Sequence, residues 1–242
     1  MSVAAATWKD QLSATTRPVA AAASAGLLAG VGIGGIGGRL AMFVLRLTSD
    51  PSLRGLKTDD DFTIGVFSGE TAFLMFATAF LGVLGGLVYL VVRSWLPVGG
   101  RPWLYGGLTA IVGGALVIRP NGIDFTLLEP LSLAVAMFIA LPAAYGVVTS
   151  LLTERFLAAG SRFERWGVWL GGIPALVPLA ALGPVGLALL ILIAAVVLLG
   201  RAAPQIGSVW TTPTITWIGR TTLVAIAALW SAELVRDTVE VL

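Results

Sequence analysis

The chain has 242 residues, of which 57% are hydrophobic and only 12% are charged, and its mean hydropathy is +0.94. Because soluble domains carry about 25% charged residues, this composition excludes an ordinary soluble globular protein. The sequence contains no His and no Cys, which excludes metal ligation by these residues, disulfides, and imidazole or thiol catalysis. We therefore expect an all-α fold, a polytopic bundle of transmembrane helices.

Apolar runs predict about seven membrane crossings after a polar N-terminal segment at 1–17, which is expected in the cytoplasm. A crossing takes roughly 20 residues, so the remaining chain, 18–242, forms a single transmembrane domain in this interpretation. Turn-forming Pro and Gly residues fall between the runs. The predicted spans are 18–47, 70–92, 102–118, 128–152, 167–182, 185–200 and 218–238.

The fifth and sixth runs are shorter than the others. Each has about 16 residues, or about 24 Å of helix, whereas the hydrocarbon core is roughly 30 Å thick. Pro174 and Pro178 lie in the first of these runs, and Pro184 lies between the two. Two full crossings and one re-entrant hairpin both remain open for this pair. In either case the chain returns to the side that it left, so the orientation of the other helices is unaffected.

The basic residues indicate the orientation of the bundle. The inner side would carry Lys9, Arg17, Arg93, Arg101, Arg155, Arg162, Arg165, Arg201 and Arg220, and the outer side Arg46, Arg54, Lys57, Arg119 and Arg236. This excess favours an N-terminus inside and a C-terminus outside. Most acids fall on the outer side, and only Asp10, Glu154 and Glu164 are expected on the inner side. The tryptophans expected at cytoplasmic helix ends are Trp95, Trp103, Trp166, Trp169, Trp210 and Trp217.

The first span carries a ridge of glycines. Gly26, Gly30, Gly34 and Gly38 recur every four residues, so they lie on one face of a helix, where they allow a second backbone to approach closely. We expect tight helix packing there. A flexible or unwound helix that lines a transport path is the alternative.

Two arginines follow the ridge. Because a charge in the membrane interior is costly, each should either pair with an acidic residue or reach the membrane surface. Arg39 lies inside the predicted span, and Arg46 is seven residues later, on nearly the same face. A charge within a span costs about 2.5–3.5 kcal/mol on insertion scales. The functional interpretation is a polar site for an ion or small solute. The structural interpretation pairs Arg39 with Glu233 or Glu70 and lets Arg46 reach the interface.

A repeated order of residues suggests that the first two helix pairs are parallel repeats. A Gly-Gly pair, an arginine, Asp-Phe-Thr and a glutamate occur in this order around 37–70 and again around 113–129. The repeat would gather acids around one outer mouth. The candidate ion or solute site comprises Arg39, Arg46, Glu70, Asp124, Glu129 and Glu233, and Asp61 is a weak candidate metal ligand.

The leading hypothesis is an integral membrane protein that binds or passes a small ion or solute. The alternative is a non-catalytic membrane subunit or scaffold that packs through its glycine-rich helices, alone as a homo-oligomer or with another membrane protein. We expect no enzyme activity and no cofactor, because no catalytic motif is present. The scattered basic residues fit a lipid bilayer partner better than a nucleic acid. Expected localisation is the cell membrane, the inner membrane of a bacterium.

Overall fold

The computed structural model describes residues 8–50, 69–122, 125–126, 129–167, 172–202 and 205–242. Throughout these residues the secondary structure is helical, and none of them forms a strand. The elements are α1 (Trp8–Ala29), η1 (Gly30–Gly37), α2 (Gly38–Thr48), α3 (Gly69–Val92), η3 (Val98–Gly100), α4 (Arg101–Val117), α5 (Leu131–Leu157), α6 (Arg162–Gly167), α7 (Ile173–Ala180), α8 (Pro184–Ala202), α9 (Gln205–Trp210) and α10 (Pro213–Val241).

Four helical stretches are long and apolar enough to cross a membrane, and they indicate a multi-pass membrane protein. They are Thr16–Thr48, Ala72–Val92, Leu131–Leu157 and Pro213–Val241. Each contains most of a predicted span. The first helix, however, already begins at Trp8 within the polar segment, and α5 continues past the predicted end at 152.

The other three predicted spans have different outcomes. The run at 102–118 corresponds to α4, whose 17 residues are about 26 Å long, and the run at 185–200 corresponds to α8, of 19 residues. The run at 167–182, for which a full crossing and half of a re-entrant hairpin are both open, is described only in part. There α6 ends at Gly167, residues 168–171 lie outside the described part, and α7 has only eight residues, about 12 Å. Pro174 and Pro178 lie in this short helix, where each removes a backbone donor.

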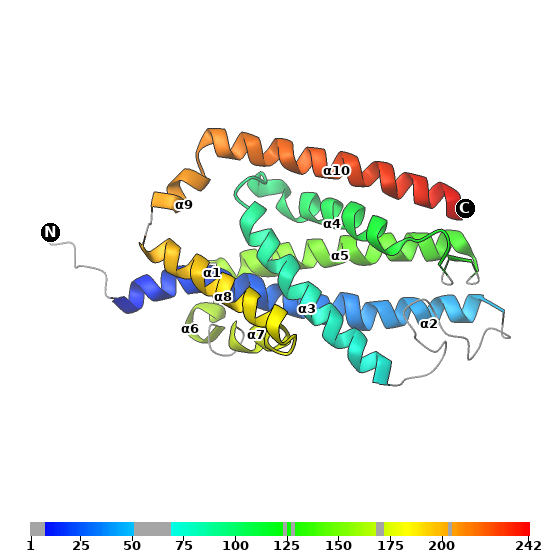
Figure 1. The fold of residues 1–242 in the computed structure, drawn as a ribbon, viewed down its shortest axis with the longest axis horizontal. Coiled ribbons are helices and arrows are strands. Elements are labelled where there is room, and N and C mark those ends of the chain that lie inside the picture. The colour runs from blue at the N-terminus through cyan, green and yellow to red at the C-terminus, as the bar shows by residue number, and fades with distance from the viewer. Residues whose placement is uncertain (1–7, 51–68, 123–124, 127–128, 168–171, 203–204) are drawn as a thin grey trace.

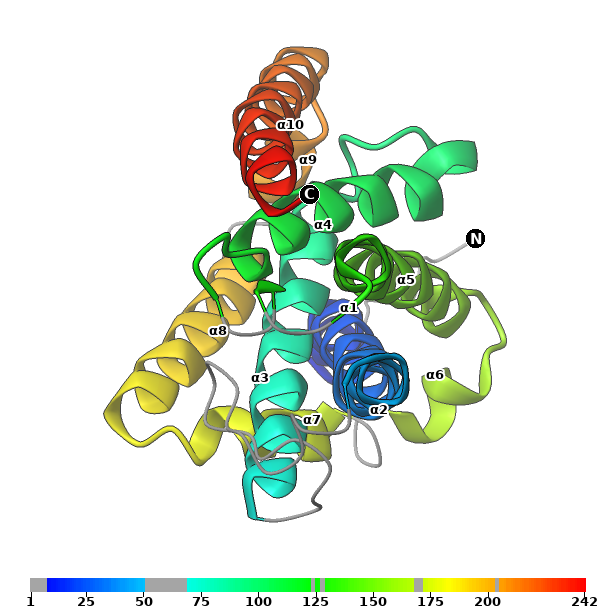
Figure 2. The same ribbon diagram turned by 90° about the vertical axis from the view of Figure 1, so that its right-hand side faces the viewer.

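The long helices alternate in direction along the bundle. In Figure 1, α1 and α2 run from left to right, α3 returns, α4 runs to the right, α5 returns, and α10 ends at the right. Figure 2 shows α1, α3 and α5 at the centre, with α7 and α8 on one side and α10 on the other. α10 contacts mainly α4 and buries the smallest share of its surface among the four long helices. The N-terminal and C-terminal ends of the described chain therefore lie at opposite ends of the bundle.

The first helix crosses α3 at a contact between glycines. Gly26 and Gly30 face Gly82 and Gly86 of α3, which are also four residues apart. A Cβ on Gly82 would lie 2.8 Å from the Gly30 α-carbon and against the Gly26 carbonyl, and a Cβ on Gly86 would lie 3.1 Å from the Gly26 α-carbon. The predicted tight packing of the ridge is confirmed at these two glycines, because no side chain fits between the backbones.

Gly30 and Gly34 of the ridge lie in a wider section of helix, and Gly38 directly follows it. η1 is a π-helix within an otherwise α-helical stretch, and its sequence, GVGIGGIG, is dominated by glycine, which has little conformational preference. A Cβ on Gly34 would lie 3.1 Å from the Thr78 side chain, whereas one on Gly38 would meet nothing within 4 Å. The helix remains continuous from α1 through α2, so it is widened here but not broken.

Candidate functional site

The structure describes part of the predicted ion or solute site. Arg39 and Arg46 lie on α2, Glu129 precedes α5, and Glu233 lies on α10. The remaining side chains, those of Glu70, Asp124 and the weak metal candidate Asp61, lie outside the described part of the structure.

The two arginines of α2 are half-buried near the end of the first helix. The Arg46 guanidinium carbon lies 5.7 Å from the centroid of the Phe43 ring, within the range of a cation–π contact. The neighbouring Leu40, Phe43 and Leu47 are exposed, as expected for a helix surface in contact with lipid. These apolar neighbours are consistent with the structural interpretation of Arg46, in which its apolar methylene groups lie along the helix and its guanidinium reaches the membrane interface.

Glu233 has a partner on its own helix. Its carboxylate lies 2.6 Å from an Arg236 nitrogen, and Arg236 also donates to Asp237 at 3.1 Å. Asp237 is buried, while Arg236 is exposed. The charged end of the last helix is therefore paired within α10, through a three-residue spacing between Glu233 and Arg236 and a contact from Arg236 to the adjacent Asp237.

Glu129 contributes a backbone contact between the end of α2 and the connection that precedes α5. Its N–H donates to the Ser49 hydroxyl oxygen at 2.9 Å, and this hydroxyl donates to the Leu45 carbonyl at 2.7 Å. The contact joins the end of α2 to the start of α5. It places Arg46 and Glu129 at the same end of the bundle, and the Glu129 side chain is exposed.

A second charged cluster, which the sequence analysis did not single out, lies at the opposite end of the bundle. Glu154 of α5 accepts two hydrogen bonds from Arg93, at 2.9 and 2.7 Å, and one from Arg101 at 3.2 Å. The three side chains come from three segments: the end of α3, the start of α4 and the last turns of α5. The Arg93 contact is bidentate and charge-assisted, the strong form of such a pair. These hydrogen bonds raise the pKa of the Arg93 guanidinium above its ordinary value.

The Tyr89 hydroxyl extends this cluster into the bundle. It donates to Glu154 at 2.7 Å and accepts a hydrogen bond from Ser150 at 2.9 Å. Tyr89 is fully buried and its ring lies 4.9 Å from that of Tyr105, whose hydroxyl donates to the Gly85 carbonyl. We call Tyr89, Arg93, Arg101, Ser150 and Glu154 the Glu154 cluster.

Replacing Tyr89 with phenylalanine is expected to lower the free energy of unfolding by about 1–2 kcal/mol. The change removes two hydrogen bonds and leaves the buried Ser150 hydroxyl without its acceptor. Thermal unfolding in detergent measures the loss. Tyr105→Phe is the control, because it removes one hydrogen bond from a similarly buried ring, and the two rings touch. Equal losses in the two variants would contradict this role for Tyr89.

Arg17 caps the same end of the bundle. Its guanidinium donates to the carbonyl oxygens of Leu157 and Ala158 at 3.2 and 3.0 Å, at the end of α5, and to Glu164 at 2.9 Å. A cation is favourable there because helix C-termini carry partial negative charge and free carbonyls. The contact ties the first helix to α5 and α6.

Tryptophans gather at this end as well, as the interfacial pattern predicts. The Trp95 and Trp210 rings lie 5.0 Å apart, and Trp210 donates to the Val91 carbonyl at 3.1 Å. Trp103 and Trp217 are exposed in the first turns of α4 and α10. Trp169 lies outside the described residues, and so does the side chain of Trp166.

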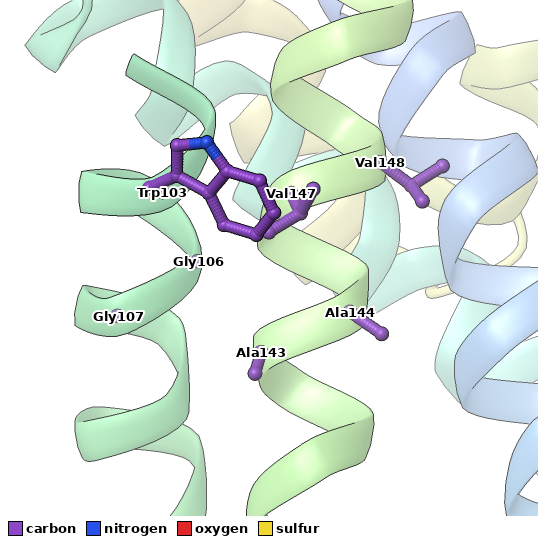
Figure 3. A pocket seen from close by; sticks show the side chains of 7 residues that line it. All are labelled: Trp103, Gly106, Gly107, Ala143, Ala144, Val147 and Val148. Atoms are coloured by element: carbon purple, nitrogen blue, oxygen red, sulfur yellow. The ribbon is translucent and has the colours of Figure 1, made fainter. Parts of the chain in front are cut away.

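An apolar groove lies between α4 and α5, with a volume of about 380 Å³. Trp103 extends over its upper end toward Val147, and the backbone of Gly106 and Gly107 forms one wall (Figure 3). The lining residues are Trp103, Gly106, Gly107, Ala143, Ala144, Val147 and Val148. None of them carries a charge or a catalytic group, so the groove suits hydrocarbon and not an ion.

The arrangement offers little for metal or cofactor chemistry in the described residues. No three Asp or Glu side chains lie together there in a way that could hold a metal ion. The Glu154 carboxylate, the best-placed acid, is already engaged by two guanidiniums and a phenol. Compared with protein-family models, with curated proteins and with solved structures, the chain gives no match.

Proposed function

We propose that the chain is a membrane protein with its Arg-rich end in the cytoplasm and its C-terminus outside. The N-terminal and C-terminal ends of the described chain lie at opposite ends of the bundle, and the long helices alternate in direction (Figure 1). Both features support a topology in which the two termini lie on opposite sides of the membrane. Arg17 and Arg39 are 22 residues apart, which is about 33 Å at the rise of an α-helix and somewhat less here because Gly30–Gly37 is a π-helix, so the distance is close to the thickness of the hydrocarbon core. Arg39 then lies at the outer surface of the core and not at its centre. Such a position carries a much smaller energetic cost.

The topology that fits this orientation contains a re-entrant hairpin at α7 and α8. The two helices contact each other, and both pack on the first helix. The turn between them lies part-way along the bundle, and α8 leads back to the end where α6 lies (Figure 1). α4 then crosses with the long helices, and the number of full spans is five instead of seven.

The parallel repeat is also part of this proposal. The first helix with α3, and α4 with α5, form two antiparallel pairs that run in the same order of directions. Both pairs pack through glycine. In the second pair a Cβ on Gly146 would lie 2.9 Å from the Gly106 α-carbon. The half of the repeated motif at 51–68 lies outside the described residues, so the support comes from the helices.

The chain works, in this proposal, as a non-catalytic membrane subunit or scaffold. The observation that carries it is the internal pairing of charges: Glu154 binds Arg93 and Arg101, Glu233 binds Arg236, and Arg17 binds Glu164. A transport site needs polar groups that remain free to exchange between protein and solute. The α1–α3 crossing is likewise closed by backbone contact and leaves no polar passage between these helices.

Binding or passage of a small ion is the second candidate function. The Ser49–Glu129 contact favours it, because it brings the end of α2 and the connection that precedes α5 together beside Arg46. The complete site would be Arg39, Arg46, Glu70, Asp124, Glu129 and Glu233. It differs from the first proposal in requiring that these groups face water.

Ion flux into proteoliposomes separates the two functions. We expect vesicles with the wild-type chain to take up Na⁺, K⁺, Cl⁻ and protons no faster than protein-free vesicles, and we expect Arg39→Ala to behave identically. The measurement uses ion-sensitive dyes under an imposed gradient. A wild-type flux several-fold above that of empty vesicles that is lost in a correctly folded Arg39→Ala variant would reject the scaffold function and support transport.

A further inference from the structure

The α4–α5 groove has a size that separates two classes of occupant. An α-helix of about 10 Å diameter fills about 420 Å³ per turn. The groove, at about 380 Å³, is smaller than one such turn, so it could contact one face of a helix but could not enclose it. A single hydrocarbon chain is much thinner and suits the apolar lining. Gly107 leaves the space open, since a Cβ there would meet nothing within 4 Å.

The position of the groove gives it access to lipid from one leaflet. Trp103 is 75% exposed in the first turn of α4, the place where interfacial tryptophans meet the lipid headgroups. In Figure 3 its indole nitrogen is on the side of the ring away from Gly107. A lipid acyl chain that entered beside this ring would run along the α4–α5 groove toward the middle of the membrane.

The charge at this end of the groove favours an anionic headgroup. Arg101 begins α4, two residues before Trp103, and shares Glu154 with Arg93. Two guanidiniums on one carboxylate leave a net positive charge of one beside the groove. Arg155, on the last turns of α5, is exposed at the same end and is also basic. Basic residues near the surface each attract anionic lipid by about 1 kcal/mol.

We propose that the α4–α5 groove binds one acyl chain of an anionic phospholipid, with the lipid phosphate beside the Arg93–Arg101 end of the Glu154 cluster. The apolar residues that line the groove contact the acyl chain, and the excess positive charge selects an anionic headgroup. This inference does not depend on the scaffold function, because a transporter or a scaffold could carry the same lipid.

Native mass spectrometry of the purified chain tests the proposal. The protein is exchanged into detergent with equal amounts of phosphatidylglycerol and phosphatidylethanolamine, and bound lipid is counted. We expect one retained phosphatidylglycerol on the wild type. Gly107→Leu and Ala144→Leu each fill the groove and should lower that retained fraction at least tenfold. Ala228→Leu, on the exposed surface of α10, is the matched control and should retain the lipid.

Three outcomes would overturn the proposal. Equal lipid retention by Gly107→Leu and wild type would show that the groove is not the site. Equal retention of phosphatidylglycerol and phosphatidylethanolamine would show that the groove does not select an anionic headgroup. A wild-type dimer that both Leu variants convert to a monomer, without any change in lipid, would assign the groove to a second copy of the chain. Size-exclusion chromatography confirms folding of each variant.

Discussion

Replacing Gly82 with valine is expected to separate the first helix from α3 and to prevent recovery of folded protein. Even a methyl group at Gly82 would lie 2.8 Å from the Gly30 α-carbon and against the Gly26 carbonyl. Backbone cannot rotate aside as a side chain can, so the helices must move apart. Overpacked cores lose about 1–3 kcal/mol, and we expect at least about 3 kcal/mol here. Fluorescence-detected size-exclusion chromatography after heating measures the loss.

The first helix supplies a matched control. Gly32 lies in η1, between Gly30 and Gly34, yet a Cβ there would meet nothing within 4 Å. Gly32→Val should therefore keep the elution profile of the wild type and change the melting temperature far less than Gly82→Val. Comparable losses in the two variants would mean that general helix flexibility, and not the crossing, determines stability.

Replacing Glu154 with glutamine is expected to have the second largest effect. The change removes the negative charge that holds Arg93 and Arg101 together and weakens the hydrogen bond from Tyr89. Breaking a buried ion pair costs about 3–5 kcal/mol, and partial exposure of these side chains reduces that cost. We expect a loss of about 2 kcal/mol in the free energy of unfolding. Chemical or thermal denaturation in detergent provides the measurement.

Glu164→Gln is the control for this prediction. Its carboxylate also pairs with an arginine, Arg17, but its side chain is 44% exposed. Exposed pairs contribute about 0–1 kcal/mol, so the loss should be less than half of that for Glu154→Gln. If Arg93→Gln combined with Glu154→Gln costs as much as the sum of the single variants, the two residues are not coupled and the prediction fails.

Local patterns predicted the long helices and which charged residues share one end of the bundle. Long apolar runs predicted the four long helices, because helix length follows from the thickness of the membrane. The ridge of Gly26 and Gly30 predicted a close backbone contact. Alternating sides predicted that Arg93, Arg101 and Glu154 would share one end, and the structure brings these three together.

The sequence did not predict which residues pair with which in these contacts, and the structure was needed to identify the partners. Gly82 and Gly86 have the same four-residue spacing as the ridge, but the spacing does not state which glycine faces which. Glu154 was one of only three acids predicted on the inner side, among nine basic residues, and that imbalance was the available signal. The register between α3, α4 and α5 decides which arginines reach it, and register depends on packing along the whole length of the helices.

The eight-residue α7 shows where hydropathy alone is insufficient. The run at 167–182 is apolar enough for a span. A short helix that packs on other helices, such as α7, is equally rich in apolar residues. Ala175 and Leu179 are fully buried against the first helix and α3, in a cluster with Ala23 and Val83. Internal burial of this kind gives the same composition as contact with lipid, so the sequence could not separate them.

The glycine crossing also determines which parts of the protein are able to move. The first helix and α3 approach each other at glycines whose added Cβ atoms would meet backbone, so this crossing fixes the relative position of the two helices. Any change of shape must then come from elements that it does not hold. α10 rests mainly on α4 at the edge of the bundle (Figure 2). Because α10 has the smallest buried share of the four long helices, displacing it would disturb fewer contacts than displacing the first helix or α3.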